Sequence, residues 1–151
     1  MSLSDLAPAE LALLDGARRA VLATIRPDGS PRLVPIVYAT DVAAGRIYSP
    51  LDQKRKSISD PRRLARARDI AARPQASVLV DRWSEDWSAL GWLRLDGRAE
   101  LLEPHDAANS AEHETAVRLL EERYPQYAGH ELARRPIIRL TVERTASWAA
   151  V

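Results

Sequence analysis

The stretch VLATIRPDGSPRLVPIVY, residues 21–38, decides the fold, because it reads as two β-prone segments joined by a tight turn. The turn is RPDGS, residues 26–30, in which Pro27 presets φ and Gly29 tolerates a positive φ. The flanking segments 17–25 and 31–39 are mostly apolar. We therefore predict a β-hairpin here.

Further short elements surround this hairpin. Leu11 and Leu14 stand at helical spacing and predict a helix over 8–15, and a third strand is expected at 46–49 after a turn at 41–45. Helices are also predicted over 61–73 and 110–123, and strands over 76–83, 92–102 and 135–143. Asp96-Gly97 marks either a hairpin turn or a bulge in one long strand. This order favours an α+β protein or a small barrel over a doubly wound sheet.

Composition narrows the function classes. The 151 residues, 46% of them hydrophobic, predict a single domain spanning 1–151, and no apolar stretch is long enough to span a membrane, so we expect a cytoplasmic protein. The absence of cysteine excludes disulfides, thiolate nucleophiles and iron-sulfur clusters. The three histidines lack metal-ligand spacing and are expected to be exposed, so no metal site is predicted. The scattered glycines form neither a dinucleotide-binding motif nor a P-loop.

Positive charge is concentrated in one segment. Between Lys54 and Arg73 the chain has eight basic and two acidic residues, although its net charge is only +1. Such a segment is typical of phosphate binding, because ammonium and guanidinium groups are strong donors to phosphate oxygens. A solvated basic face is the alternative. A nucleic-acid-binding module is less favoured, since no aromatic residues are interleaved to stack on bases.

The order of the segments resembles the pyridoxamine 5′-phosphate oxidase-like superfamily, whose members share an FMN-binding split barrel. The resemblance rests on the first hairpin, on RARDIAARPQASVLVD (66–81), on WLRLDGRAELL (92–102) and on YPQYAG (124–129). It implies an α+β, mainly β fold: a six-stranded antiparallel split β-barrel (Greek key) with flanking helices. It also implies a homodimer with cofactor sites at the subunit interface. One departure is Asp69, where relatives often have asparagine, and another is the long connection from Ser49 to Arg66.

Within the superfamily, LDQKRK (51–56), DRWSEDWSALGW (81–92) and the final strand leading to a tryptophan are similar to the branch that uses coenzyme F420. The resemblance implies an F420-dependent oxidoreductase that transfers a hydride from reduced deazaflavin to a small conjugated organic acceptor. One alternative is an FMN-binding flavoprotein, acting as a flavin reductase or as an oxidase of a phosphorylated pyridoxine-type substrate. Another is a non-catalytic cofactor carrier.

The same resemblance implies a set of cofactor-binding residues. Phosphate or a polyanionic tail is expected to bind four basic residues of the charged segment: Lys54, Lys56, Arg66 and Arg68. Ser49, which ends a strand, is expected to line the ring site through its backbone, and Trp87 is expected near the cofactor, contributed by the second subunit. For Trp87 the alternatives are dimer packing and a loop anchor. No general acid, base or nucleophile stands out, which is consistent with a cofactor that supplies the chemistry.

Overall fold

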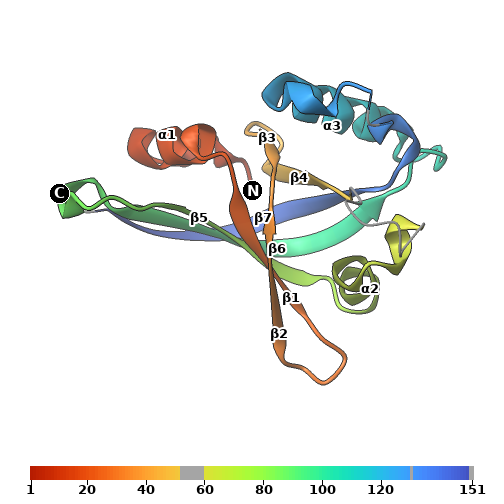
Figure 1. Cartoon of the computed structure of the whole chain (residues 1–151), viewed down its shortest axis with the longest axis horizontal. Coiled ribbons are helices and arrows are strands. Elements are labelled where there is room, and N and C mark those ends of the chain that lie inside the picture. Colours follow the sequence, from red (N-terminus) through yellow and green to blue (C-terminus); the bar gives the residue numbers. More distant parts are fainter. Residues whose placement is uncertain (52–59, 130, 150–151) are drawn as a thin grey trace.

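The computed structural model describes residues 1–51, 60–129 and 131–149. Seven strands form one antiparallel sheet in the order β2-β1-β5-β6-β7-β4-β3, curled into a half-barrel (Figure 1). The strands are β1 (Ala20–Ile25), β2 (Pro31–Ile36), β3 (Ala39–Asp41), β4 (Arg46–Pro50), β5 (Gln75–Arg82), β6 (Gly91–Leu102) and β7 (Ile137–Ala149). The helices are α1 (Pro8–Gly16), α2 (Ala65–Ala72) and α3 (Ser110–Arg123), and short 3-10 turns include η2 (Pro61–Arg63) and η3 (Trp87–Ala89). The mainly β split-barrel class is confirmed.

The first hairpin is confirmed. β1 and β2 pair antiparallel from Ala20 opposite Ile36 to Ile25 opposite Pro31. Gly29 takes a φ of 86° in the connecting turn, a conformation that L side chains rarely adopt. Local turn chemistry therefore sets the hairpin register, as the sequence predicts.

The number of strands differs from the expected six. We predicted one strand over 31–39, but β2 ends at Ile36 and a separate strand, β3, begins at Ala39 and pairs with β4. The break lies at Tyr38, whose backbone N–H and carbonyl both bond the hydroxyl of Tyr124, at 3.2 and 3.0 Å. These two backbone groups are thus occupied by a side chain instead of a neighbouring strand.

The open alternative at Asp96-Gly97 resolves as a bulge. β6 runs unbroken through both residues, and its register with β7 shifts between them. A Cβ atom on Gly97 would lie 1.9 Å from the carbonyl oxygen of Thr141 in β7, so only glycine allows the strands to approach this closely. The bulge bends the long strand that runs between β5 and β7.

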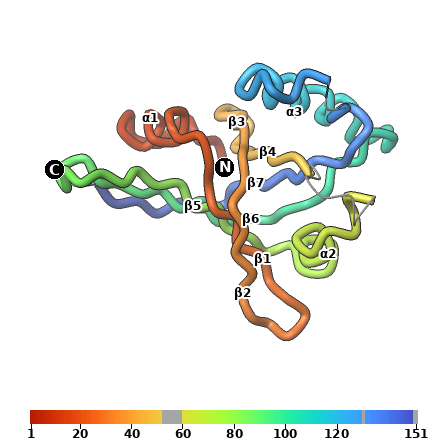
Figure 2. Tube along the Cα trace, in the orientation of Figure 1, coloured from red at the N-terminus to blue at the C-terminus, as the bar shows by residue number. Residues whose placement is uncertain are grey.

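Two apolar cores cover different parts of the sheet. The larger joins α1 and α2 to inward residues of β1, β5, β6 and β7, and the smaller joins α3 to β3, β4 and the start of β7. Side chains on β5 alternate between the larger core and the opposite face, where Leu79 is exposed. The far ends of β5, β6 and β7 extend as an arm away from α2 and α3 (Figure 2). We call the face that carries Leu79 the open face.

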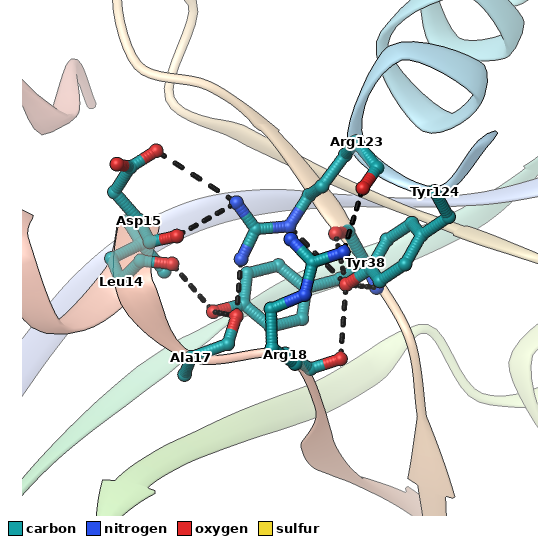
Figure 3. Close-up of polar contacts among 7 residues, drawn as sticks. All are labelled: Leu14, Asp15, Ala17, Arg18, Tyr38, Arg123 and Tyr124. Carbon is teal, nitrogen blue, oxygen red and sulfur yellow. Dashed lines mark hydrogen bonds and ion pairs between the residues drawn. The ribbon is translucent and has the colours of Figure 1, made fainter.

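A polar cluster joins the C-terminal ends of α1 and α3 (Figure 3). The Tyr38 hydroxyl donates to the carbonyl oxygen of Leu14 at 2.5 Å, and Arg123 donates to that of Asp15 at 2.8 Å. The Arg123 guanidinium also lies over the Tyr38 ring, 4.9 Å from its centroid. Burial raises the pKa of Tyr38 to about 12, so its hydroxyl remains a donor. The cluster holds the two helices in place beside β3.

Candidate functional site

The structure places the sequence-predicted residues at different points of the fold. Ser49 is buried near the end of β4, and its hydroxyl donates to the carbonyl oxygen of Val37 at 2.9 Å. That hydroxyl is therefore engaged with the backbone between β2 and β3, and Ser49 itself is paired opposite Ile138 of β7. Lys54 and Lys56 lie outside the described residues.

The basic helix forms but is shorter than the predicted 61–73, because Leu64 has an extended ψ of 141° that separates the 3-10 turn η2 from α2, which begins at Ala65. α2 carries Arg66, which is half-buried, and Arg68, which is exposed. Its inward residues are Ala67 and Ile70, together with a charged residue, Asp69, which is only 3% exposed. The sequence analysis missed Asp69 as an inward residue, although its spacing from Arg66 and Arg73 puts all three on one helix face.

Asp69 is the centre of a buried polar group. Its Oδ2 accepts hydrogen bonds from the Thr24 hydroxyl at 2.8 Å and from Arg32 Nε at 2.7 Å. Burial alone would raise the pKa of Asp69, but the bonds from Arg32 and Thr24 outweigh it and hold that pKa below its usual value. The group connects the first hairpin to the basic helix.

An apolar hollow of about 450 Å³ opens on the arm of the open face. Trp92 and Trp148 stand opposite each other in the β6–β7 register, and Trp83 lies beside them, 68% exposed. We call this the tryptophan hollow; its lining is completed by Leu79, Asp81, Arg82, Leu90, Gly91 and Arg94. Its size and aromatic lining suit a flat organic ring.

Trp87 lies next to this hollow in sequence but does not line it. It begins η3 in the β5–β6 connection, where the Asp86 carboxylate caps the backbone N–H of Ser88, and it is 69% exposed. Trp83, Trp92 and Trp148 occupy the lining instead. Trp83 and Trp92 lie within the strands predicted over 76–83 and 92–102, whereas Trp148 lies beyond the predicted end of the last strand at 143. The observed β7 extends to Ala149 and so brings Trp148 opposite Trp92.

A second depression, the polar groove, lies beside the turn end of the first hairpin and has a volume of about 650 Å³. Its residues come from β1, β5, β6 and β7 and include Gln75, Ser77, Asp96, Arg98 and Arg144. Drug-sized ligands occupy pockets of this volume.

Asp96 separates the groove from the tryptophan hollow. Its carboxylate accepts hydrogen bonds from the Ser77 hydroxyl at 2.5 Å, from Arg94 Nε at 3.1 Å and from Arg144 Nε at 3.3 Å. Burial by itself would raise the pKa of Asp96, but these bonds lower it below the usual value. The carboxylate is therefore ionised at neutral pH and anchors two arginines, of which Arg94 lines the hollow and Arg144 the groove.

The expectation that the histidines are exposed is wrong for His113. His113 is not exposed as expected but buried in α3, with Nε2 2.6 Å from the carbonyl oxygen of Arg135. Its role is structural, connecting α3 to the segment before β7. Across residues 1–51, 60–129 and 131–149, no three potential metal-binding side chains gather in one place.

Comparison with known structures supports the same fold. A conserved hypothetical protein of Mycobacterium tuberculosis superposes with a TM-score of 0.72 at 24% identity, over 99% of this chain and 90% of that one. The heme storage protein of Vibrio cholerae superposes with a TM-score of 0.68 at 15% identity, over 99% of this chain and 95% of that one. A FAD-binding protein of Mesorhizobium loti superposes with a TM-score of 0.64 at 23% identity, over 94% of this chain and 92% of that one.

No helix in the described part of the chain is long and apolar enough to cross a membrane.

The sequence pattern of the pyridoxamine 5′-phosphate oxidase family matches residues 6–149, nearly the whole chain. The protein therefore belongs to the pyridoxamine 5′-phosphate oxidase family.

Proposed function

We propose that this protein is an F420-dependent oxidoreductase that works as a pair of identical chains and transfers a hydride from reduced deazaflavin to a small conjugated organic acceptor. One observation carries the proposal: the tryptophan hollow lies on a sheet face that no described helix covers. The segments that resemble the F420 branch, 81–92 and the final strand, both contribute to this hollow. Residues far apart in sequence thus form one surface suited to a planar ring.

The exposure of this face supports pairing of two chains. Leu33 and Leu79, which share the open face, are 67% and 39% exposed, and Trp83 and Trp148 are 68% and 49% exposed. Clustered exposed apolar side chains of this size are typical of a protein interface. A second copy that covers the open face would bury them and enclose a ring bound beside them.

The proposed cofactor contacts are divided between two regions. Lys54, Lys56, Arg66 and Arg68 bind the phosphate or the anionic tail, and Ser49 contributes its backbone. The tryptophan hollow, together with Trp87 of the β5–β6 connection, covers the ring from the second copy. The fit is chemical, because the basic residues match an anion and the indoles match a conjugated ring.

A flavin or deazaflavin, once bound, supplies the hydride chemistry, and the residues of this chain bind and orient it and exclude water. Asp96, which lies between the hollow and the groove, stays ionised and is engaged with Ser77, Arg94 and Arg144. It therefore serves as a fixed negative charge and not as a proton donor. No residue of this chain is assigned as a general acid or base.

FMN is the second candidate, favoured by membership of the pyridoxamine 5′-phosphate oxidase family and by structural similarity to the FAD-binding protein of M. loti. With FMN, the same contacts would support a flavin reductase or an oxidase of a phosphorylated pyridoxine-type substrate. The basic residues would then hold the single phosphate of FMN.

The test is a titration of the purified protein with F420 and, separately, with FMN, followed by fluorescence quenching at two salt concentrations. We expect micromolar or tighter binding of F420, weaker FMN binding, and weaker binding at high salt because the tail is anionic. Lys54→Ala with Lys56→Ala should weaken binding by about 1–3 kcal/mol. A preference for FMN would establish the second candidate, and binding of neither cofactor would overturn the redox assignment.

A further inference from the structure

Three rows of side chains cross the open face on the arm of β5, β6 and β7 (Figure 2). Residues opposite each other in neighbouring antiparallel strands share a face, and every second residue of a strand returns to it. From the tip of the arm inward, the rows are Asp81 with Trp92 and Trp148, Leu79 with Arg94 and Ala146, and Ser77 with Asp96 and Arg144. Arg94 therefore lies between a row that carries two indoles and a row of polar groups.

Arg94 lines the tryptophan hollow from the middle row. Its neighbours across the strands are apolar, Leu79 on β5 and Ala146 on β7. The Arg94 side chain is 48% exposed, so a ligand in the hollow can reach it.

Asp96 fixes the direction of the Arg94 guanidinium. Nε of Arg94 donates to Oδ2 of Asp96 at 3.1 Å, and the Ser77 hydroxyl holds Oδ1 of Asp96 at 2.5 Å. Among the described residues, none accepts a hydrogen bond from the two terminal nitrogens of Arg94. Because the guanidinium is a rigid plane, the bond at Nε determines where these nitrogens point. Two terminal N–H groups side by side match the two oxygens of a carboxylate.

The charges around the hollow leave one positive charge without a counterpart. Asp96 alone serves two arginines, because Nε of Arg144 also donates to its Oδ2, at 3.3 Å. The other charged residues that line the hollow are Asp81 and Arg82, whose charges cancel. A second copy that covers the open face would remove water from this site, and an unpaired cation out of water is costly. A ligand that brings one negative charge removes this cost.

We infer that the hydride acceptor is a planar conjugated carboxylic acid, that the indoles of the tryptophan hollow contact its conjugated system, and that Arg94 binds its carboxylate through the terminal nitrogens. In the proposed function, on which this inference rests, the acceptor lies against the ring that the hollow covers. Arg94 binds and orients the acceptor and takes no part in the transfer of the hydride.

A carboxylate fits this site better than a phosphate or a neutral group does. It carries the single negative charge that the site lacks, and conjugation keeps it in the plane of the ligand. A phosphate monoester carries about 1.5 to 2 negative charges at neutral pH and would leave negative charge unbalanced. An amide offers one oxygen to the two terminal nitrogens and leaves the charge of Arg94 unpaired.

The first measurement compares trans-cinnamate with its neutral amide, cinnamamide, on the wild-type protein without cofactor. The two probes have the same planar conjugated system and differ in charge. In ¹H–¹⁵N spectra we expect cinnamate to shift the indole N–H resonances of Trp92 and Trp148 and the Nε–Hε resonance of Arg94. We expect it to bind at least about tenfold more tightly than cinnamamide. Equal affinities, or shifts confined to residues outside the hollow, would overturn the inference.

The second measurement repeats both titrations on R94Q and R98Q. R94Q removes the charge but leaves Asp96 with two partners, Ser77 and Arg144, so no buried carboxylate is stranded. R98Q is the matched control, because Arg98 is an exposed arginine of the same strand that lines the polar groove and not the hollow.

We expect R94Q to bind cinnamate about tenfold more weakly than wild type does, and cinnamamide within about twofold of wild type. R98Q should bind both probes as wild type does. Equal losses in the two variants would mean that net charge alone attracts the acid, and would refute the role of Arg94. The molar mass of R94Q in light scattering should equal that of wild type; a lower mass together with loss of both probes would make Arg94 an interface residue and contradict the inference.

The acid site and the proposed function can fail separately. If F420 or FMN binds and the wild type does not distinguish cinnamate from cinnamamide, the inference is wrong and the proposed function stands. If neither cofactor binds and cinnamate binding still depends on Arg94, the proposed function fails. The role of the acid as hydride acceptor then fails with it, and the acid site stands.

Discussion

Replacement of Glu112 by glutamine should destabilise the fold through one ion cluster. Glu112, on α3, accepts hydrogen bonds from Arg46 and from the Tyr48 hydroxyl, the latter at 2.9 Å, both in β4. Its second oxygen accepts from Arg139 of β7 at 2.6 Å. A single carboxylate therefore holds α3 against two strands of the sheet.

The magnitude follows from the burial of the partners. The side chains of Glu112 and Arg139 are 19% and 12% exposed, and that of Arg46 is 33% exposed. Removing one partner of a fully buried ion pair lowers the free energy of unfolding by about 3–5 kcal/mol, whereas removing one partner of an exposed ion pair lowers it by about 0–1 kcal/mol. Glutamine keeps one acceptor but points an N–H₂ group at cationic donors, so we expect Glu112→Gln to lower the free energy of unfolding by about 2–4 kcal/mol.

The effect should depend on pH. Burial alone would raise the pKa of Glu112, but the hydrogen bonds from Arg46, Tyr48 and Arg139 outweigh it and lower that pKa from its usual 4.5. A group with a lowered folded-state pKa stabilises the fold above its unfolded pKa and loses this contribution as pH falls through the folded value. The difference between wild type and variant should be full at pH 7 and shrink below about pH 4.5.

The assay is urea unfolding at pH 7 and at several acidic values, with Glu122→Gln as a matched control. Glu122 lies on the same helix and pairs with Arg118 at 3.6 Å, but both side chains are about 60% exposed. The control should therefore change stability by about 0.5 kcal/mol or less. Equal effects of the two substitutions, or a difference at pH 7 that persists unchanged at low pH, would refute the reasoning.

Three shorter predictions concern other parts of the fold. Gly97→Ala should disrupt the β6–β7 ladder, because the added Cβ would collide with the carbonyl of Thr141, and should lower the free energy of unfolding in urea by more than about 2 kcal/mol. Gly16→Ala is the control: nothing lies within 4 Å of an added Cβ there, so its free energy of unfolding should be nearly unchanged. Tyr124→Phe should lower the free energy of unfolding by about 1–3 kcal/mol, because it leaves the buried backbone N–H of Tyr38 without its acceptor. A change under about 0.5 kcal/mol would contradict the stabilising role of the polar cluster around Tyr38 and Tyr124. Trp148→Ser should shift the proposed dimer toward monomer in light scattering, because it removes an exposed indole from the proposed interface, and should leave the unfolding curve of the monomer unchanged. A molar mass equal to that of the wild type at every concentration would place the interface elsewhere.

Much of the fold could be predicted because its signals are local. The turn at residues 26–30 sets its own hairpin, and α3 forms over the predicted residues, Ser110–Arg123, because its helical pattern ends before Pro125. The basic helix was likewise visible from its own residues. The family resemblance added the class of barrel, which no single segment specifies.

The site could be predicted only in part. A concentration of positive charge is visible at the level of composition, and it is the basis on which phosphate binding by Arg66 and Arg68 is predicted. The ion pair between Arg32 and Asp69 could not be predicted, because in sequence Arg32 is one more arginine in an alternating strand. Asp69 lies 37 residues away, and the docking of α2 on the hairpin brings the two side chains together.

The sequence alone determined the elements whose stability depends on neighbours a few residues apart: the turn geometry at Gly29, the ends of α3 and the alternation along the strands. The tertiary structure decided the features that need partners distant in sequence. Tyr124 interrupts the second strand from 86 residues away, and the tryptophan hollow joins β5 and β6 to the last strand. The physical reason is that propensity and turn chemistry act within a few residues, whereas hydrogen-bond satisfaction and burial depend on which surfaces the folded chain brings together.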